Sequence, residues 1–178
     1  VQATYLLNCQ LKANGKLLVE GRKGVIIGGK TCAKLGVSCN GIGNIAEIAT
    51  VVSVGIDKED MTAYQELQKK IEQTQAELQT CENGLNKLMA NPDEKVSMMI
   101  QRLTRAVYTL KSSRKELFSE RNAQMEQMTK QKEARIQVSG RAYPGTLLFL
   151  NEDPFAIKEI YNNVEFVKHD NRIDTLAH

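Results

Sequence analysis

The sequence predicts a mixed β and α protein, a β-solenoid of stacked short strands interrupted by a long antiparallel coiled-coil hairpin. Two patterns lead to this prediction. Residues 1–56 and 134–178 alternate apolar and polar residues in short pieces between glycines, whereas residues 57–133 carry a helical heptad repeat. We therefore expect β-helix rungs over 1–56, the coiled-coil arm over 57–133, and a return to the β-helix with a closing segment over 134–178.

The first segment consists of strand-like pieces such as Leu7–Ala13 and Val25–Ile27, separated by glycines. Short strands at near-even spacing with glycine turns occur in sandwiches, barrels and solenoids. Small inward residues and an aromatic content of only 5% favour the solenoid, because its thin interior has no room for large side chains.

The arm is predicted from residues that recur alternately three and four positions apart, which is the seam of a coiled coil. The first helix contributes Tyr64, Leu67, Ile71, Thr74, Leu78, Cys81, Leu85 and Leu88. The second helix contributes Val96, Ile100, Leu103, Val107, Leu110, Arg114, Leu117, Arg121, Gln124 and Met128. Facing residue numbers in an antiparallel pair share a constant sum, here about 184, which places Cys81 opposite Leu103.

Both helix starts are signalled. Asp57 is a suitable N-cap with Asp60 three residues later, and Asn91 with Pro92 suits the start of the second helix. At about 1.5 Å per residue, such an arm reaches roughly 50 Å. An arm of that length has little core of its own, which favours reach or partner contact as its purpose.

Methionines gather near the predicted reversal of the arm, and exposed methionines suit adaptable protein contacts. Closing the tip of the hairpin is an equally good reason for them. The candidate partner-binding residues are Met89, Met98, Met99 and Arg102.

After the arm, the alternation resumes at Ile136–Val138. Because the two ends of the arm must lie side by side, we expect Val51–Val54 and Ile136–Val138 to lie in neighbouring rungs. Further on, Phe155–Tyr161 is expected to form a short helix. Val164–Val167 is expected to form a closing hairpin with Ile173, around a turn at residues 169–172.

Composition narrows the classes of function. A net charge of +3 is too mild to indicate nucleic acid, and a chain without tryptophan offers few base-stacking side chains. The longest apolar runs are far too short to span a membrane, and no signal peptide is visible. Cys9, Cys32, Cys39 and Cys81 lack the paired spacing of zinc sites, so we expect reduced cytoplasmic thiols and neither metal nor cofactor. Because the chain begins at Val1, we expect a fragment of a longer protein.

Some motifs imitate enzymes. Gly24–Thr31 fits the phosphate-loop pattern G-x-x-x-x-G-K-S/T, but no helical pattern follows it. A phosphate loop before a coiled coil, with Ser139-Gly140 and an acidic strand end after it, is the order found in chromosome-organising ATPases. However, Asn151 stands where the magnesium-binding aspartate belongs, and about 55 residues before the coil are too few for a nucleotide-binding lobe.

A second enzyme class is the hexapeptide acyltransferase, since apolar or small residues recur every six positions from Ile27 to Val51. That chemistry needs a histidine base beside the rungs. The histidines of this chain, His169 and His178, both lie near its far end.

Several stretches resemble the bacterial flagellar assembly protein A family. The run Gly24–Gly29, closed by Ala33, resembles its G-x-I-x-G-G stretch, and Ile42–Asn44 followed by Ala49–Gly55 resembles its next motif. The helical hairpin directly afterwards and Ala142–Gly145 on the return match too. Thr31 and Ala49 depart from the family, where an aliphatic residue and a proline are common.

This resemblance implies a right-handed parallel β-helix with a coiled-coil insertion, in a cytosolic bacterial protein without known catalysis. It also implies additional sequence before this region. From these patterns and the resemblance, we expect a non-enzymatic scaffold whose arm or β-helix ends bind another protein or a second copy, with a role in flagellar or cell-pole assembly. The alternatives are a hexapeptide-type acyltransferase and a nucleotide-binding coiled-coil ATPase fragment.

Overall fold

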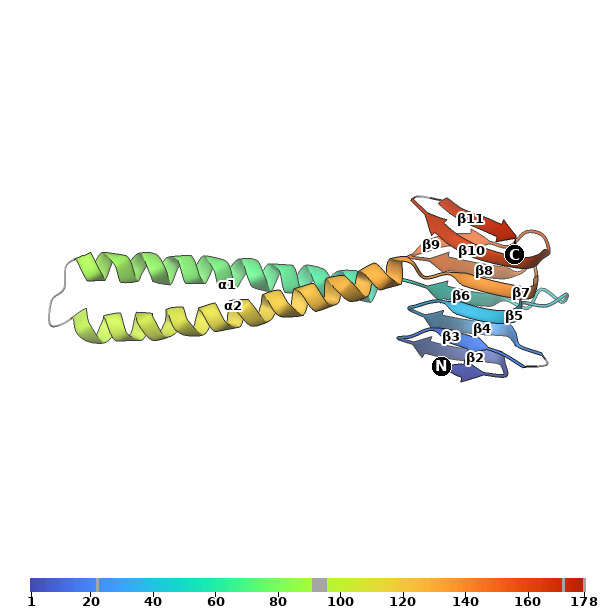
Figure 1. The fold of residues 1–178 in the computed structure, drawn as a ribbon, viewed down its shortest axis with the longest axis horizontal. Helices are drawn as coiled ribbons and strands as arrows, with labels where there is room; N and C mark the ends of the chain where they lie inside the picture. The colour runs from blue at the N-terminus through green and yellow to red at the C-terminus, as the bar shows by residue number, and fades with distance from the viewer. Residues whose placement is uncertain (22, 91–95, 171, 178) are drawn as a thin grey trace. The chain divides into compact units, whose positions relative to one another are not determined.

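The computed structural model describes residues 1–21, 23–90, 96–170 and 172–177. They form two compact units, a β unit of Val1–Asp60 with Gln127–His178 and a helical unit of Met61–Glu126. The elements are shown in Figure 1 and are, in chain order, β1 (Gln2–Ala3), β2 (Tyr5–Ala13), β3 (Leu17–Val19), β4 (Val25–Ala33), β5 (Val37–Ile42), β6 (Thr50–Val54), α1 (Lys58–Ala90), α2 (Ser97–Lys132), β7 (Ile136–Ala142), β8 (Thr146–Leu150), β9 (Asp153–Ala156), β10 (Tyr161–His169) and β11 (Arg172–Ala177).

The strands of the β unit stack as rungs (Figure 1). In one column β1, β3, β5 and β7 are successive parallel neighbours, and in another β2, β4, β6 and β8 are. The first halves of β2 and β4 form a further column with the ends of β5 and β7, since Val25 pairs with both Tyr5 and Gly41. Each rung runs through every column, and the successive rungs are 1–13, 17–33, 37–54 and 136–150.

Inward-facing side chains stack from rung to rung and form the core. Leu6, Ile26, Ile42 and Ala142 occupy one such stack, in which each residue pairs with the next through the strand register. All of them are buried, and the core as a whole is mostly aliphatic.

The last rung is closed by antiparallel strands. β9 pairs with β8, β10 pairs with β7, and β11 pairs with β10. The predicted closing hairpin is thus confirmed, with His169 opposite Arg172 at its turn. At the first rung, β1 and β2 are each paired along one edge only within the part of the chain that the structure describes.

The predicted helix at Phe155–Tyr161 is wrong. Phe155 lies in β9 and Tyr161 begins β10. The rings of Phe155 and Tyr161 pack on Phe166, at centroid distances of 5.5 and 5.7 Å, and Phe166 is fully buried. Pairing with β8 and this aromatic contact outweigh the local helical pattern, because burying large apolar side chains is worth more than intrinsic propensity.

The helices leave and re-enter the β unit between two successive rungs. The strands that flank them, β6 and β7, do not pair with each other. β6 pairs with β8, and β7 pairs with β5, so the flanking strands lie in successive rungs but in different columns. Val51–Val54 and Ile136–Val138 therefore lie in neighbouring rungs, as expected, but their strands are not hydrogen-bonded to each other.

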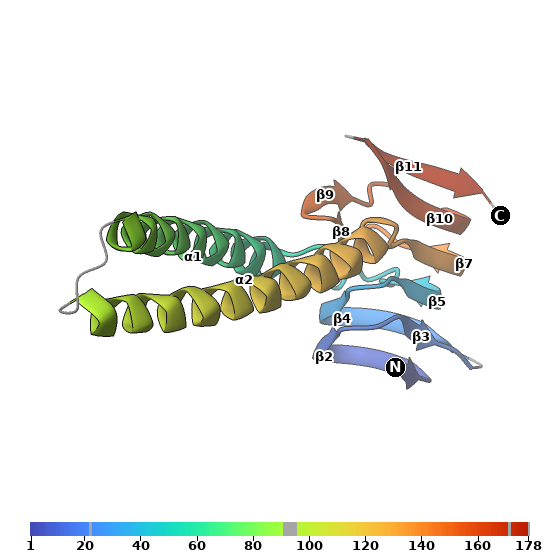
Figure 2. The same cartoon turned by 60° about the vertical axis from the view of Figure 1, so that its left-hand side comes forward.

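The two helices run side by side in the helical unit (Figure 2). Every residue of the predicted seam is buried or half-buried, and Leu67, Ile71, Leu78 and Val107 are the most buried. The Arg114 guanidinium donates to Gln75 Oε1 at 2.7 Å, one turn from Ile71, the residue that the predicted register places opposite Arg114. The predicted cap at Asn91 and Pro92 lies outside the described residues.

Candidate functional site

The first turn of α1 is fixed by reciprocal capping within the β unit. The Asp60 N–H donates to Asp57 Oδ1 at 2.9 Å, and the Asp57 N–H donates to Asp60 Oδ2 at 3.3 Å. These bonds satisfy backbone donors that the first turn of a helix leaves without an intrahelical partner. The N-cap predicted from the sequence is confirmed.

Two lysines, one in the first rung and one directly after the second, form ion pairs with the same turn. Lys34, which directly follows β4, places its Nζ 2.5 Å from Asp60 Oδ1 and 3.9 Å from Asp57 Oδ2. Lys12 of β2 lies 2.5 Å from Glu59 Oε2 and 3.5 Å from Asp57 Oδ2. Lys34 is only 12% exposed, whereas Lys12 is 49% exposed, so the Lys34 pair is the less screened of the two.

These charges shift the acid–base properties of the turn. Burial raises the pKa of Asp57, but the Asp60 backbone N–H, followed by the positive charges of Lys34 and Lys12, outweighs it, and the pKa lies below its ordinary value. The hydrogen bond to Glu59 raises the pKa of Lys12. Both groups therefore keep their charges at neutral pH, and their ion pair fixes the first turn of α1 to the strands.

Asn151 binds the backbone at both ends of the helical insertion. It lies in the turn between β8 and β9, where its Oδ1 accepts from the Ile56 N–H at 2.9 Å and its Nδ2 donates to the Lys132 carbonyl at 3.2 Å. Its φ of 50° places it in the left-handed region, which asparagine tolerates. Ile56 directly precedes the cap of α1 and Lys132 ends α2, so one side chain fastens the chain where it leaves the rungs and where it returns.

The close fit at this point requires glycine at position 55. Gly55 has a φ of 90°, and a Cβ there would lie 2.0 Å from Asn151 Oδ1. We call the capped turn, the two lysines and Asn151 the helix junction. In the sequence, Asn151 stood out only as a replacement for a magnesium-binding aspartate, and this structural role was not predicted. The one available signal was a polar turn residue directly after a buried strand.

An open groove of about 690 Å³ borders the helix junction on the outer surface of β2, β4, β6 and β8. Cys32, Ser53 and Phe149 line it, and Lys12, Lys30, Asp57 and Glu59 add charge. Most of that charge is already used in the ion pairs of the junction, and the Cys32 thiol accepts a hydrogen bond from Ser53. This arrangement joins the helix start to the rungs.

The motifs that imitate enzymes lie in strands. Val25–Thr31 of the phosphate-loop pattern lie in β4, whose backbone pairs with β2 and β6 instead of curling around an anion. Ser139 and Gly140 lie in β7. His169 is exposed and its Nδ1 lies 3.2 Å from Asp174 Oδ2 across the closing hairpin, while His178 lies outside the described residues.

The cysteines are free thiols. Burial raises the pKa of Cys39 to about 12, which makes it a poor nucleophile at neutral pH. Within the described residues, the structure brings together no group of three or more His, Cys, Asp or Glu side chains that could hold a metal ion.

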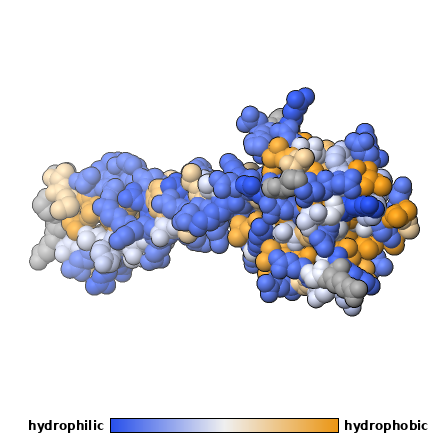
Figure 3. All heavy atoms as spheres, turned by 45° about the vertical axis from the view of Figure 1, so that its right-hand side comes forward, coloured by the Kyte–Doolittle hydropathy of each residue, from blue (hydrophilic) through white to orange (hydrophobic). Residues whose placement is uncertain are grey.

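The predicted partner-binding residues lie at the ends of the helices that border residues 91–95. Met89 is 60% exposed, Met98 is 71% and Met99 is 59%. A depression of about 420 Å³ is lined by Met98, Met99 and Arg102, together with Leu103 and Ala106, which were not predicted from the sequence to bind a partner. Met89 is not part of its lining. In Figure 3, apolar colour appears at this end of the helical unit, whose visible surface is otherwise largely hydrophilic.

Neither helix, over its described residues, contains a stretch that is both long and apolar enough to cross a bilayer. In comparisons with known proteins, a family model described as the flagellar assembly protein A beta solenoid domain matches residues 1–173. No curated protein and no solved structure matches the chain.

Proposed function

This chain belongs to the flagellar assembly protein A family, and from that premise we propose that it is a non-enzymatic scaffold whose helices bind another protein. In this proposal the β unit is a right-handed β-solenoid, and α1 with α2 is an antiparallel coiled-coil arm. The observation that carries the proposal is the pair of hydrogen bonds that Asn151 makes to Ile56 and Lys132, which we call the Asn151 clamp. Because the long helical insertion is fixed at both of its ends, it is an ordered part of the protein and not a loose loop.

The distribution of buried and exposed residues supports the coiled-coil arm. The seam residues are buried or half-buried, and the residues between them are largely exposed and polar. Such a pair of helices buries little beyond its own seam, so its length creates surface and not core. Exposed methionines at Met89, Met98 and Met99 interrupt this polar surface and suit contact with a protein.

The family to which the chain belongs supports a role in assembly. A protein of this family is expected to act in the bacterial cytoplasm, in the construction of flagella or of another structure at the cell pole, without a cofactor. The charged groups next to the groove support a structural reading, because they bind one another at the helix junction.

The test is to excise the arm. Residues 61–126 are replaced by a short glycine-serine linker, which joins the capped first turn of α1 to the last turns of α2. We expect the β unit to keep its cooperative unfolding and strand circular dichroism, because its rungs and junction remain. A photo-crosslinking amino acid at Met98 in the intact chain should capture one discrete protein in the cell that makes it.

The matched control places the same crosslinker at Gln73, an exposed polar position on α1. Equal capture from positions 98 and 73, or capture from neither, would contradict the proposed function. So would an arm-excised variant that supports the cellular role of the protein as well as the intact chain does.

A further inference from the structure

We propose that the depression lined by Met98, Met99 and Arg102 binds an amphipathic helix whose apolar face is bordered by Asp and Glu side chains. This inference rests on the proposed function and names the class of partner at that surface. It is argued from the shape of the depression, the chemistry of its lining and the charge around it.

The lining residues form a stripe along α2. Met98, Met99, Arg102, Leu103 and Ala106 follow one another at one, three, one and three positions, which keeps them on one side of the helix. From Met98 to Ala106 the stripe is about 12 Å long, at 1.5 Å per residue. Two turns of a partner helix have the same length, so a helix lying along α2 can place its apolar residues into the stripe.

Apart from Arg102, the lining is apolar. Ala106 lowers the surface between the longer side chains, and the methionines offer unbranched, polarizable side chains that adapt to the shape of a partner. The surface is exposed and not a closed cavity, since Met98 is 71% and Met99 59% exposed. An apolar residue docked there would remove both methionines from water.

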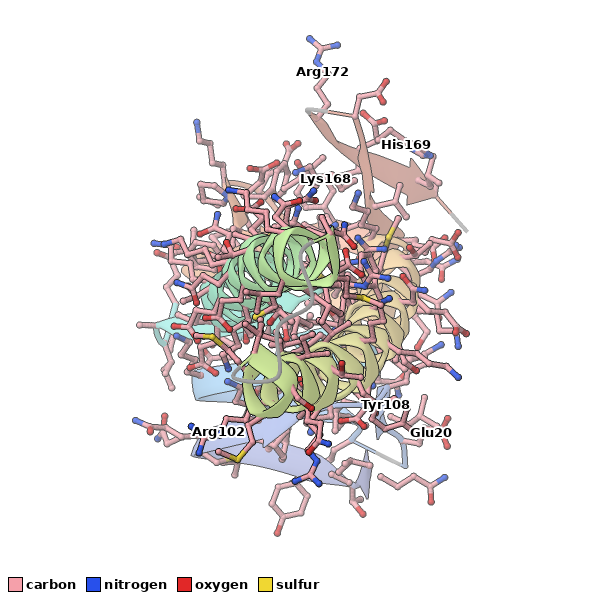
Figure 4. All side chains as sticks on the ribbon, turned by 90° about the vertical axis from the view of Figure 1, so that its left-hand side faces the viewer. Glu20, Arg102, Tyr108, Lys168, His169 and Arg172 are labelled. Carbon is pink, nitrogen blue, oxygen red and sulfur yellow. The ribbon has the colours of Figure 1, made fainter. Side chains whose placement is uncertain are left out.

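The charge around the depression selects the partner. Between Ser97 and Lys115, α2 carries Arg102, Arg105, Lys111, Arg114 and Lys115 and no Asp or Glu. Lys111 is paired with Glu82 at 2.8 Å, and Arg114 with Gln75. Arg102 and Arg105 are exposed, and Figure 4 shows Arg102 projecting outward from α2.

Within the described residues, no ion pair of Arg102 or Arg105 is present. A partner with acidic residues beside its apolar face is therefore attracted to this surface, and a basic partner is repelled. Nucleic acid would also meet the cations, but the lining itself offers methionine, leucine and alanine in place of the aromatic side chains on which bases stack.

The experiment uses the full chain and two synthetic helical peptides. They share one apolar face of leucine and alanine, and differ in carrying only glutamate or only lysine beside it. Fluorescence anisotropy of the labelled peptides measures their affinities. We expect the glutamate peptide to bind about fivefold more tightly than the lysine peptide, which corresponds to two solvent-exposed ion pairs, and we expect the difference to shrink at high salt.

The charge-reversed variant Arg102→Glu/Arg105→Glu should reverse the preference, and Met98→Ser/Met99→Ser should weaken binding of the glutamate peptide. The matched control Lys69→Glu/Lys70→Glu makes the same charge change on α1 and should leave the preference unchanged. Circular dichroism confirms that each variant remains helical.

Three outcomes overturn the proposal. One is equal affinity for the two peptides, another is a preference that survives the charge reversal, and the third is tighter binding of a labelled single-stranded RNA that depends on Arg102. If the peptides show no preference while the crosslinker at position 98 still captures one protein, the acidic helix is wrong and the scaffold function stands. If arm excision is also without effect in the cell, the scaffold function is wrong as well.

Discussion

The β unit and the helical unit are stabilised in different ways. Rungs in the β unit pair across long separations in the sequence, and their inward side chains form a continuous core. In the helical unit, over its described residues, the buried apolar side chains are Leu67, Ile71, Leu78 and Val107, and the backbone bonds are local. The difference teaches that residues 61–126 contribute mostly exposed surface, whereas the β unit contains most of the buried core.

The largest expected effect tests the core of the β unit. Phe166 is fully buried and contacts Phe155 and Tyr161, so Phe166→Ala should lower the free energy of unfolding by about 3–5 kcal/mol. Chemical denaturation followed by circular dichroism measures the loss. The control is Tyr108→Ala in α2, where the ring is 78% exposed and a change within about 0.5 kcal/mol is expected. Equal losses in the two variants would erase the contrast between the units.

The next prediction tests whether the helical unit melts on its own. Leu78 is 1% exposed in the seam, and Leu78→Ala should destabilise the helices by about 2–3 kcal/mol. Because the core of the β unit shares no residue with this seam, ellipticity at 222 nm should fall at a lower temperature than the strand signal. A single transition for both signals would show that the two units unfold together.

The helix junction links the two units in sequence, and Asn151 is its most informative residue. Asn151→Ala removes the bonds to the Ile56 N–H and the Lys132 carbonyl and should cost about 2 kcal/mol. Asn151→Gly keeps the left-handed backbone favourable and isolates the loss of the side chain. Asn151→Asp keeps the acceptor for Ile56 but loses the donor to Lys132, so its cost should be intermediate. Denaturant unfolding measures the free energy of unfolding of the three variants. Variants as stable as the wild type would show that the two Asn151 hydrogen bonds do not hold the ends of the insertion.

A smaller effect concerns pH. Because the pKa of Asp57 in the folded protein lies below its value in the unfolded chain, its charge adds stability above the ordinary value of 3.8. That stability is lost as the pH falls through the folded-state pKa. Asp57→Asn keeps the cap without the charge, and should be less stable than the wild type by less than about 1 kcal/mol at pH 7. The gap should close in acid when unfolding is measured at both pH values. A constant gap would mean that the charge is irrelevant.

The smallest predicted change is a gain. Thr31 is fully buried in the core, and its hydroxyl has no hydrogen-bond partner within the part of the chain that the structure describes. Thr31→Val has nearly the same shape and removes an unsatisfied polar group, so it should raise the free energy of unfolding by about 1 kcal/mol. A thermal melt checks this. Thr50→Val is the contrasting variant, since the Thr50 hydroxyl bonds to Gly28 and Ile48 and its loss should destabilise.

Much of the fold follows from local patterns. All of the predicted seam residues lie buried or half-buried, the Asp57 cap is present, and the closing hairpin turns where the sequence indicated. These features depend on residues close together in the chain, whose spacing a sequence displays directly. The Phe155–Tyr161 segment was mispredicted because its pairing with β8 and its contact with Phe166 involve distant residues.

The helix junction shows the same limit. Asn151 is separated from Ile56 by the whole insertion, and no periodicity connects them. At the other end of the helices, the methionines and Arg102 were chosen as partner-binding candidates because of their residue type and their position in the chain. Leu103 was predicted from the sequence only as a seam residue. It also lines the depression because its side chain is only half-buried, and the degree of exposure of a seam residue cannot be judged from spacing alone.

The Asn151 clamp also bears on how this protein can change over generations. One side chain holds the chain at both feet of the insertion, so the length between Ile56 and Lys132 is not constrained by the rungs. Turns of both helices can be gained or lost there without altering a single strand pair. Related chains are then free to carry helices of different lengths on the same base, and an engineer can exchange the insertion as a cassette.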